Sequence, residues 1–267
     1  MKQVIFFNFL LLPILLLATN SQERDIKAKV NFENNINNIK FMIQPPVSHK
    51  RHEKNDIYHI TARYTDKIIL DISASNHLNN TLLIKHKLKN INLSNSIKYI
   101  ITDNQANKQE FLIKTKTSGF QKPKLTKATS IEKPYAADYR KLKPKVWKAM
   151  SVQKAIIELY GDVKEPIPNK IKLLGPETTY CHINIPIHIL SDIDLESFAI
   201  FNDKTAYPTV AIFSIPTDSI IDFKFKINMK YCTKYSLVVI GKDRYGNFYK
   251  TTTNGQTACA DGCGGGG

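Results

Sequence analysis

The stretch Phe223-Lys224-Phe225-Lys226-Ile227-Asn228-Met229 alternates apolar and polar side chains along its whole length. Successive side chains of a β-strand point to opposite faces of a sheet, so the alternation predicts a strand with one buried and one solvated face. Residues 183–189 repeat the pattern with isoleucine at every odd position, and Pro186 favours a place near a sheet edge. From Ile171 onward the sequence therefore predicts a β-sandwich.

The N-terminal half carries the same signature in shorter pieces. Runs of β-forming residues, separated by Pro, Asn and Asp, cover 36–43, 57–64, 67–72, 82–88, 97–101 and 110–115. Several short strands at this spacing are typical of a sandwich. The predicted fold class is all-β, with two immunoglobulin-like β-sandwich domains at residues 25–118 and 151–258.

Between these domains the chain changes character. Residues 119–150 place three prolines among lysines and small polar residues, which indicates a linker or an extension strapped against the body. One short helix then leads the second domain, since Ser151 is a good N-cap and Gly161 a good C-cap. Its apolar stripe consists of Val152, Ala155, Ile156 and Leu159.

The N-terminus has the pattern of a secretory signal peptide over residues 1–21. Lys2 supplies a positive charge, and an almost unbroken apolar run follows from Val4 to Ala18. The run is short for a membrane span, although an uncleaved anchor is the alternative interpretation. No other segment could span a bilayer, so we expect an exported protein with no membrane span in its mature form.

The chain has 38 Lys and Arg against 23 Asp and Glu, which gives a net charge of +15. This excess indicates either a solvated basic surface or attraction to an anionic ligand or partner. The basic residues are scattered through strand-like segments, and no nucleic-acid-binding motif is present. We therefore expect no nucleic-acid partner.

Four cysteines, Cys181, Cys232, Cys259 and Cys263, allow three full pairings. An exported protein places them in an oxidising compartment. Cys181 and Cys232 lie in the middle of a folded segment, which makes them a possible structural disulfide. Cys259 is either a possible redox partner of the Cys263 thiol or a buried strand cysteine.

The last nine residues, 259–267, form a tail in which Cys263 stands between glycines, namely Gly262, Gly264 and Gly265. Glycine adds nothing to a core, so the tail is either a linker remnant or a flexible arm that holds out a reactive thiol. No His or Lys in the tail would activate Cys263, which fits a carrier better than an enzyme.

Other chemistry finds no support in the sequence. It shows no Ser-His-Asp order, no phosphate loop and no paired carboxylates, so we expect no catalytic residues of its own. No structural-zinc spacing is present either. We predict no metal site and no cofactor.

Residues 150–267 resemble SoxY, the periplasmic carrier of the Sox sulfur-oxidation system. The resemblance lies in the tail Asp261-Gly262-Cys263-Gly264-Gly265 and in the body stretches Ile171-Lys172-Leu173, Ile200-Phe201-Asn202-Asp203-Lys204 and Gly246-Asn247-Phe248-Tyr249. It implies that Cys263 is the covalent attachment point for sulfur intermediates, with the three glycines as the carrier arm.

Residues 28–116 are similar to SoxZ, the partner subunit of SoxY, through 43–48, 68–73 and 102–104. The resemblance implies a fused periplasmic carrier of anionic sulfur compounds derived from thiosulfate. It also implies partner enzymes, namely a c-type cytochrome, a hydrolase and a sulfur dehydrogenase. The alternative is a secreted non-catalytic binding module, metal-handling or structural, with an incidental tail.

Overall fold

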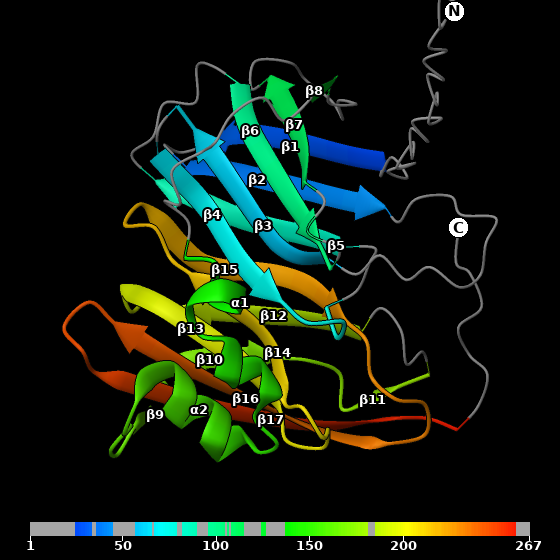
Figure 1. Cartoon of the computed structure of the whole chain (residues 1–267), viewed down its shortest axis with the longest axis vertical. Helices are drawn as coiled ribbons and strands as arrows, with labels where there is room; N and C mark the ends of the chain where they lie inside the picture. The colour runs from blue at the N-terminus through cyan, green and yellow to red at the C-terminus, as the bar shows by residue number, and fades with distance from the viewer. Residues whose placement is uncertain are drawn as a thin grey trace, which may run out of the picture.

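The computed structural model describes residues 25–33, 36–44, 57–65, 67–78, 82–89, 96–104, 106, 108–114, 124–126, 137–180 and 185–259. Most regular structure among these residues is β-strand, arranged in two sheets (Figure 1). The predicted all-β class is confirmed.

The N-terminal half supplies eight strands. They are β1 (Asp25–Glu33), β2 (Ile36–Gln44), β3 (Ile57–Tyr64), β4 (Lys67–Ala74), β5 (Leu82–Lys89), β6 (Ser96–Asp103), β7 (Lys108–Lys114) and β8 (Lys124–Thr126). The six runs expected from the sequence correspond to β2 through β7. The sequence pattern therefore predicted six of these eight strands, and β1 and β8 were missed.

The C-terminal half begins with two short helical segments and a longer helix. These are α1 (Tyr139–Leu142), the 3-10 helix η1 (Pro144–Lys148) and α2 (Val152–Tyr160). Nine strands follow: β9 (Ile167–Pro168), β10 (Ile171–Leu174), β11 (Thr178–Thr179), β12 (Ile185–Ser191), β13 (Leu195–Asn202), β14 (Thr209–Ser214), β15 (Ser219–Ile227), β16 (Lys234–Asp243) and β17 (Phe248–Thr257).

Both sheets run through from one half of the chain to the other. One sheet has the order β1-β2-β5-β15-β12-β10, and the second has the order β11-β17-β16-β13-β14-β4-β3-β6-β7-β8. The halves join where β14 pairs with β4, with Ala211 opposite Ala74, and where β15 pairs with β5, with Lys224 opposite Lys85. The halves thus meet edge to edge, and the domain boundaries stay a prediction.

The main core lies between the two sheets and includes residues from both halves. Phe41 and Tyr99 stack in the N-terminal half with ring centroids 4.0 Å apart. Phe213 and Phe223 meet edge to face at 5.3 Å in the C-terminal half. These aromatic pairs belong to one continuous apolar cluster, so the two halves share a core.

Part of the predicted linker is strapped against β4. The Ala137 amide donates to Asp71 Oδ2 at 2.7 Å, and the Tyr139 amide donates to Ser73 Oγ at 3.0 Å. Arg140 Nε donates to the Ala74 carbonyl at 2.8 Å. These bonds fix residues 137–148 on the sheet and lead the chain into α2.

Helix α2 begins and ends at the predicted caps. Ser151 Oγ accepts from the Lys154 amide at 3.2 Å, and Gly161 adopts a φ of 83°, which favours glycine. Its apolar stripe packs on the outer side of the second sheet in a smaller core cluster with Phe201 and Val238. The C-terminal half therefore has a third, helical layer (Figure 1).

The predicted signal peptide, residues 1–21, lies outside the described residues. Among the residues that are described, no helix has the length and apolar character needed to cross a membrane. The expectation of export stays a prediction.

We predict that His86 makes stability depend on pH. It is buried in β5, and burial lowers its pKa to about 3 from 6.5. Among the described residues neither ring nitrogen has a hydrogen-bond partner. Unfolded His86 binds a proton below pH 6.5 and the folded form does not, so its contribution to stability is lost as pH falls. Between pH 7 and pH 5 this loss is about 2 kcal/mol.

Urea unfolding of wild type and His86→Phe at these two pH values measures the effect. Phenylalanine keeps a ring beside Phe223, whose centroid lies 6.3 Å from the imidazole. The stability of wild type should fall further between pH 7 and pH 5 than that of the variant. Equal pH slopes for the two proteins would contradict the prediction.

Candidate functional site

The hairpin of β16 and β17 delivers the chain to its C-terminal tail. Its register runs from Lys242 opposite Phe248 to Lys234 opposite Gln256. The turn is fixed by Asp243, whose Oδ1 accepts from the Asn247 amide at 2.8 Å. Burial works to raise the pKa of Asp243, but hydrogen bonds from Asn247 and neighbouring groups outweigh it and hold the pKa below its ordinary value. The Asp243 carboxylate therefore stays ionised at neutral pH and can accept these hydrogen bonds.

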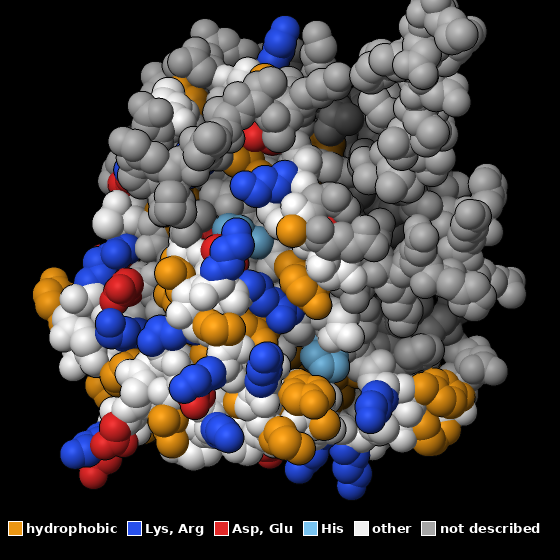
Figure 2. Space-filling view, in the orientation of Figure 1, with side chains coloured by type: hydrophobic (Ala, Val, Ile, Leu, Met, Phe, Trp, Pro, Cys, Tyr) orange, Lys and Arg blue, Asp and Glu red, His pale blue; other side chains and the backbone are white. Residues whose placement is uncertain are grey.

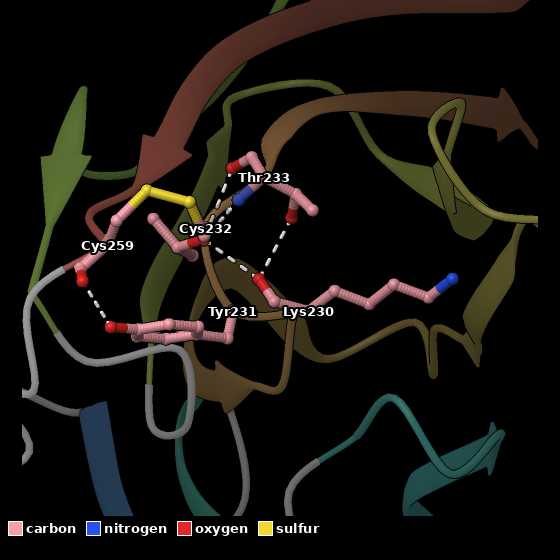
Figure 3. The surroundings of a disulfide bond; sticks show 6 residues. Lys230, Tyr231, Cys232, Thr233 and Cys259 are labelled. Atoms are coloured by element: carbon pink, nitrogen blue, oxygen red, sulfur yellow. Dashed lines mark hydrogen bonds between the residues drawn. A yellow bond between two sulfur atoms is a disulfide. The ribbon is translucent and has the colours of Figure 1, made fainter.

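A disulfide closes the open end of this hairpin. Cys232 and Cys259 are bonded, with their Cα atoms 4.4 Å apart (Figure 3). The expected Cys181–Cys232 disulfide is therefore wrong, because the hairpin register brings Cys232 next to Cys259. Because Cys259 is bonded to Cys232, it does not serve as the predicted redox partner of the Cys263 thiol. Counting outward from the turn places Cys232 within one residue of Cys259.

Hydrogen bonds surround the disulfide (Figure 3). Thr257 Oγ1 donates to the Lys230 carbonyl at 2.8 Å and accepts from the Thr233 amide at 2.9 Å. The Tyr231 hydroxyl donates to the Cys259 carbonyl. These residues connect the loop before β16 to the end of β17, and no sequence motif singled them out.

The other side of β17 is held by β11. Thr178 and Thr179 pair in parallel with Gln256 and Thr257, and the Ala258 amide donates to the Thr179 carbonyl at 2.8 Å. Strand β17 is thus paired on both sides at its last residues. The tail starts from a fixed point on the sheet.

The predicted carrier residues lie beyond this point. Cys181, Gly262, Cys263, Gly264 and Gly265 are all outside the described residues. The structure therefore describes the chain up to Cys259, where the tail begins, but it does not describe the Cys263 thiol. In the part of the chain that the structure describes, no group of three or more His, Cys, Asp or Glu side chains could hold a metal ion.

A cavity of about 370 Å³ borders the loop that carries Lys230. The Arg140 guanidinium lies in its wall, stacked between the rings of Tyr58 at 4.0 Å and Trp147 at 3.8 Å. Burial and the nearby Lys230 cation lower the pKa of His77, which also lines the cavity. The cavity is cationic through Arg140 and Lys230. Figure 2 shows Lys and Arg side chains dispersed over the face that carries α1 and α2.

Comparison with known proteins adds little beyond the fold. No family model matches the chain, and no curated protein matches it. The sulfur carrier protein SoxY from Chlorobium limicola f thiosulfatophilum is similar over 40% of this chain and 96% of its own, at 20% identity and a TM-score of 0.35.

Two further solved structures are similar over 90% of this chain. The central fibronectin-III array of RIM-binding protein is covered over 71% of its length, at 7% identity and a TM-score of 0.23. The BSP domain of a biofilm associated protein is covered over 53%, at 10% identity and a TM-score of 0.24. Likenesses this distant carry no argument about function. The fold and the tail root define an all-β sandwich protein whose C-terminal segment leaves a disulfide-anchored hairpin.

We predict that the Cys232–Cys259 bond stabilises the fold by restricting the unfolded chain. The sequence separation of 27 residues corresponds to about 3–4 kcal/mol of loop-closure entropy. Cys232→Ala combined with Cys259→Ala should lower the free energy of unfolding by roughly that amount, measured by urea denaturation. A reductant should move wild type toward the variant. Unchanged unfolding of the double variant would contradict the assignment.

We also predict that Gly255 in β17 tolerates no side chain. A Cβ there would meet Tyr235 Cζ at 2.3 Å and the Pro176 carbonyl oxygen at 2.6 Å. The Tyr235 hydroxyl donates to that same carbonyl, so ring and loop cannot both move away. Gly255→Ala should cost about 1–3 kcal/mol in thermal unfolding, as overpacking does elsewhere. The exposed neighbour Asn254→Ala is the control and should cost little.

Proposed function

We propose that this chain is a periplasmic covalent carrier of sulfur intermediates, attached to Cys263 and presented to partner enzymes. The observation that carries the proposal is the division between the two tail cysteines. Cys259 is committed to Cys232 at the sheet, while Cys263 stands outside that bond, four residues further on and between glycines. One cysteine anchors the tail, and the proposal assigns the chemistry to the other.

The attachment step joins a thiolate to thiosulfate. The Cys263 thiolate and the outer sulfur of thiosulfate form an S–S bond, which gives a cysteine S-thiosulfonate, and two electrons leave. A c-type cytochrome partner is the acceptor of these electrons. No residue of this chain is required as acid or base, in keeping with a carrier whose partners perform the chemistry.

The anchored root gives the arm its reach. From Cys259 to Cys263 an extended chain spans about 14 Å, so the thiol can enter a partner while the sandwich stays outside. Glycines without Cβ atoms keep the arm thin as well as flexible. The disulfide fixes where the arm starts and so limits the space that the thiol must search.

Cys263→Ser should abolish sulfur loading. The protein is incubated with thiosulfate and an oxidising c-type cytochrome enzyme, and its intact mass is measured. Wild type and the double variant Cys232→Ala with Cys259→Ala should each gain one thiosulfate group. Cys263→Ser should gain none while its thermal unfolding is unchanged. A gain of one thiosulfate group by Cys263→Ser would contradict the proposal.

Replacing Gly262, Gly264 and Gly265 together by valine should impair loading without removing the thiol. Branched side chains make the arm thicker and stiffer, so it enters a narrow channel poorly. The rate of loading by the enzyme should fall at least about tenfold, a barrier increase of about 1.4 kcal/mol. Alkylation of Cys263 by iodoacetamide should stay near the wild-type rate. Normal loading of the valine variant would show that the arm is not an access device.

A further inference from the structure

Basic residues follow one another in cross-strand register across the six-stranded sheet. In cross-strand register Lys29 lies opposite Lys40, Lys40 opposite Lys85, Lys85 opposite Lys224, and Lys224 opposite His188. The line crosses five neighbouring strands, β1, β2, β5, β15 and β12 (Figure 1). At the usual strand spacing it is about 19 Å long. We call these five residues the basic row.

The described side chains of the row lie on the solvent side of the sheet. Lys85 and Lys224 are exposed, and Lys40 and His188 are partly exposed. The residues that flank them along each strand are buried in the core: Ile39, Phe41, Ile84, His86, Phe223, Phe225, Ile187 and Ile189. The alternation of each strand therefore presents the row to solvent.

Like charges directly opposite one another destabilise a sheet. Asp222 compensates the β12 end of the row, since Asp222 Oδ1 lies 2.7 Å from His188 Nε2 and Asp222 Oδ2 lies 2.5 Å from Lys87 Nζ. Lys85, Lys224 and Lys226 make no ion pair with any residue that the structure describes. Lys85 and Lys224 therefore face each other across β5 and β15 as like charges.

A cavity of about 440 Å³ opens at the same place. Its apolar lining consists of Leu174, Pro176, Pro186, Ile187 and Phe225. Its basic lining is Lys85, His188, Lys224 and Lys226, with no carboxylate among the described lining residues. An apolar hollow rimmed by cations adjoins the middle of the basic row.

We propose that this face is a docking surface for an acidic protein segment that inserts one apolar side chain into the cavity. The row supplies charge complementarity along an extended chain, and the cavity supplies the buried anchor that protein interfaces use. The face does not involve Cys263, so the docking surface stands independently of the carrier function.

Other polyanions fit this face less well. Single-stranded nucleic acids stack their bases on exposed aromatic rings, and the phenyl ring among the described lining residues, Phe225, is only 3% exposed. An anionic membrane would be held by several protruding large apolar side chains, whereas the exposed apolar residues of the described lining are Leu174 and Pro186. An acidic segment uses both the charges and the cavity.

The test measures fluorescence anisotropy of a labelled peptide with alternating glutamates and one central leucine. The full chain carries Cys263→Ser, so that thiol chemistry plays no part. Lys85→Glu with Lys224→Glu should weaken binding at least about tenfold. The matched control, Lys154→Glu with Lys250→Glu, changes two exposed lysines on α2 and β17 and should bind within about twofold of the parent. A peptide with serine in place of leucine should bind several-fold more weakly.

Lys224→Glu alone separates binding from folding. It puts a carboxylate between Lys85 and His188, so its melting temperature should rise by about 1–3 °C while peptide binding falls. If the row variant and the control variant lost equal affinity for the peptide, binding would depend on net charge alone and the proposal would be overturned. No binding of the peptide by the parent would also overturn it. So would tighter, row-dependent binding of a single-stranded oligonucleotide or of anionic phospholipid vesicles.

Discussion

The pairing of β4 with β14 and of β5 with β15 is the constraint on which the rest of the structure depends. Each half of the chain would otherwise end in open sheet edges, whose unpaired amides and carbonyls invite association with other chains. Here the edge strands of the two halves pair with each other, with Ala211 opposite Ala74 in one sheet and Lys224 opposite Lys85 in the other. The shared core between the sheets then buries aromatic residues from both halves in one cluster.

Local pattern was enough to predict most of the long strands and the helix α2. The alternation from Phe223 to Ile227 gave the faces of β15 correctly, and Ser151 and Gly161 gave the ends of α2. It could not give the neighbour of β15, because alternation fixes which side of a strand is buried and says nothing about which strand lies beside it. The continuity of both sheets across the halves was therefore missed.

The cysteine pairing could have been predicted from the sequence, but only by using the register of the β16–β17 hairpin. With Lys242 opposite Phe248, pairing outward along the hairpin places Cys232 opposite Ala258, one residue from Cys259. The interpretation in favour of Cys181 used only the oxidising compartment and the position of each cysteine at a strand end. A hairpin turn fixes every partner beyond it, so the turn at Asp243 was the more informative signal.

The basic row also depends on which strands pair, and the sequence pattern does not reveal that pairing. The sequence indicates that Lys224 and Lys226 share a face, yet it gives no hint that Lys40, Lys85 and His188 continue the line. That line exists only because β5 pairs with β15, so it is a property of the joined halves and of neither half alone. A partner that docks on the row, as we propose, would therefore require the pairing of β5 with β15 that joins the two halves.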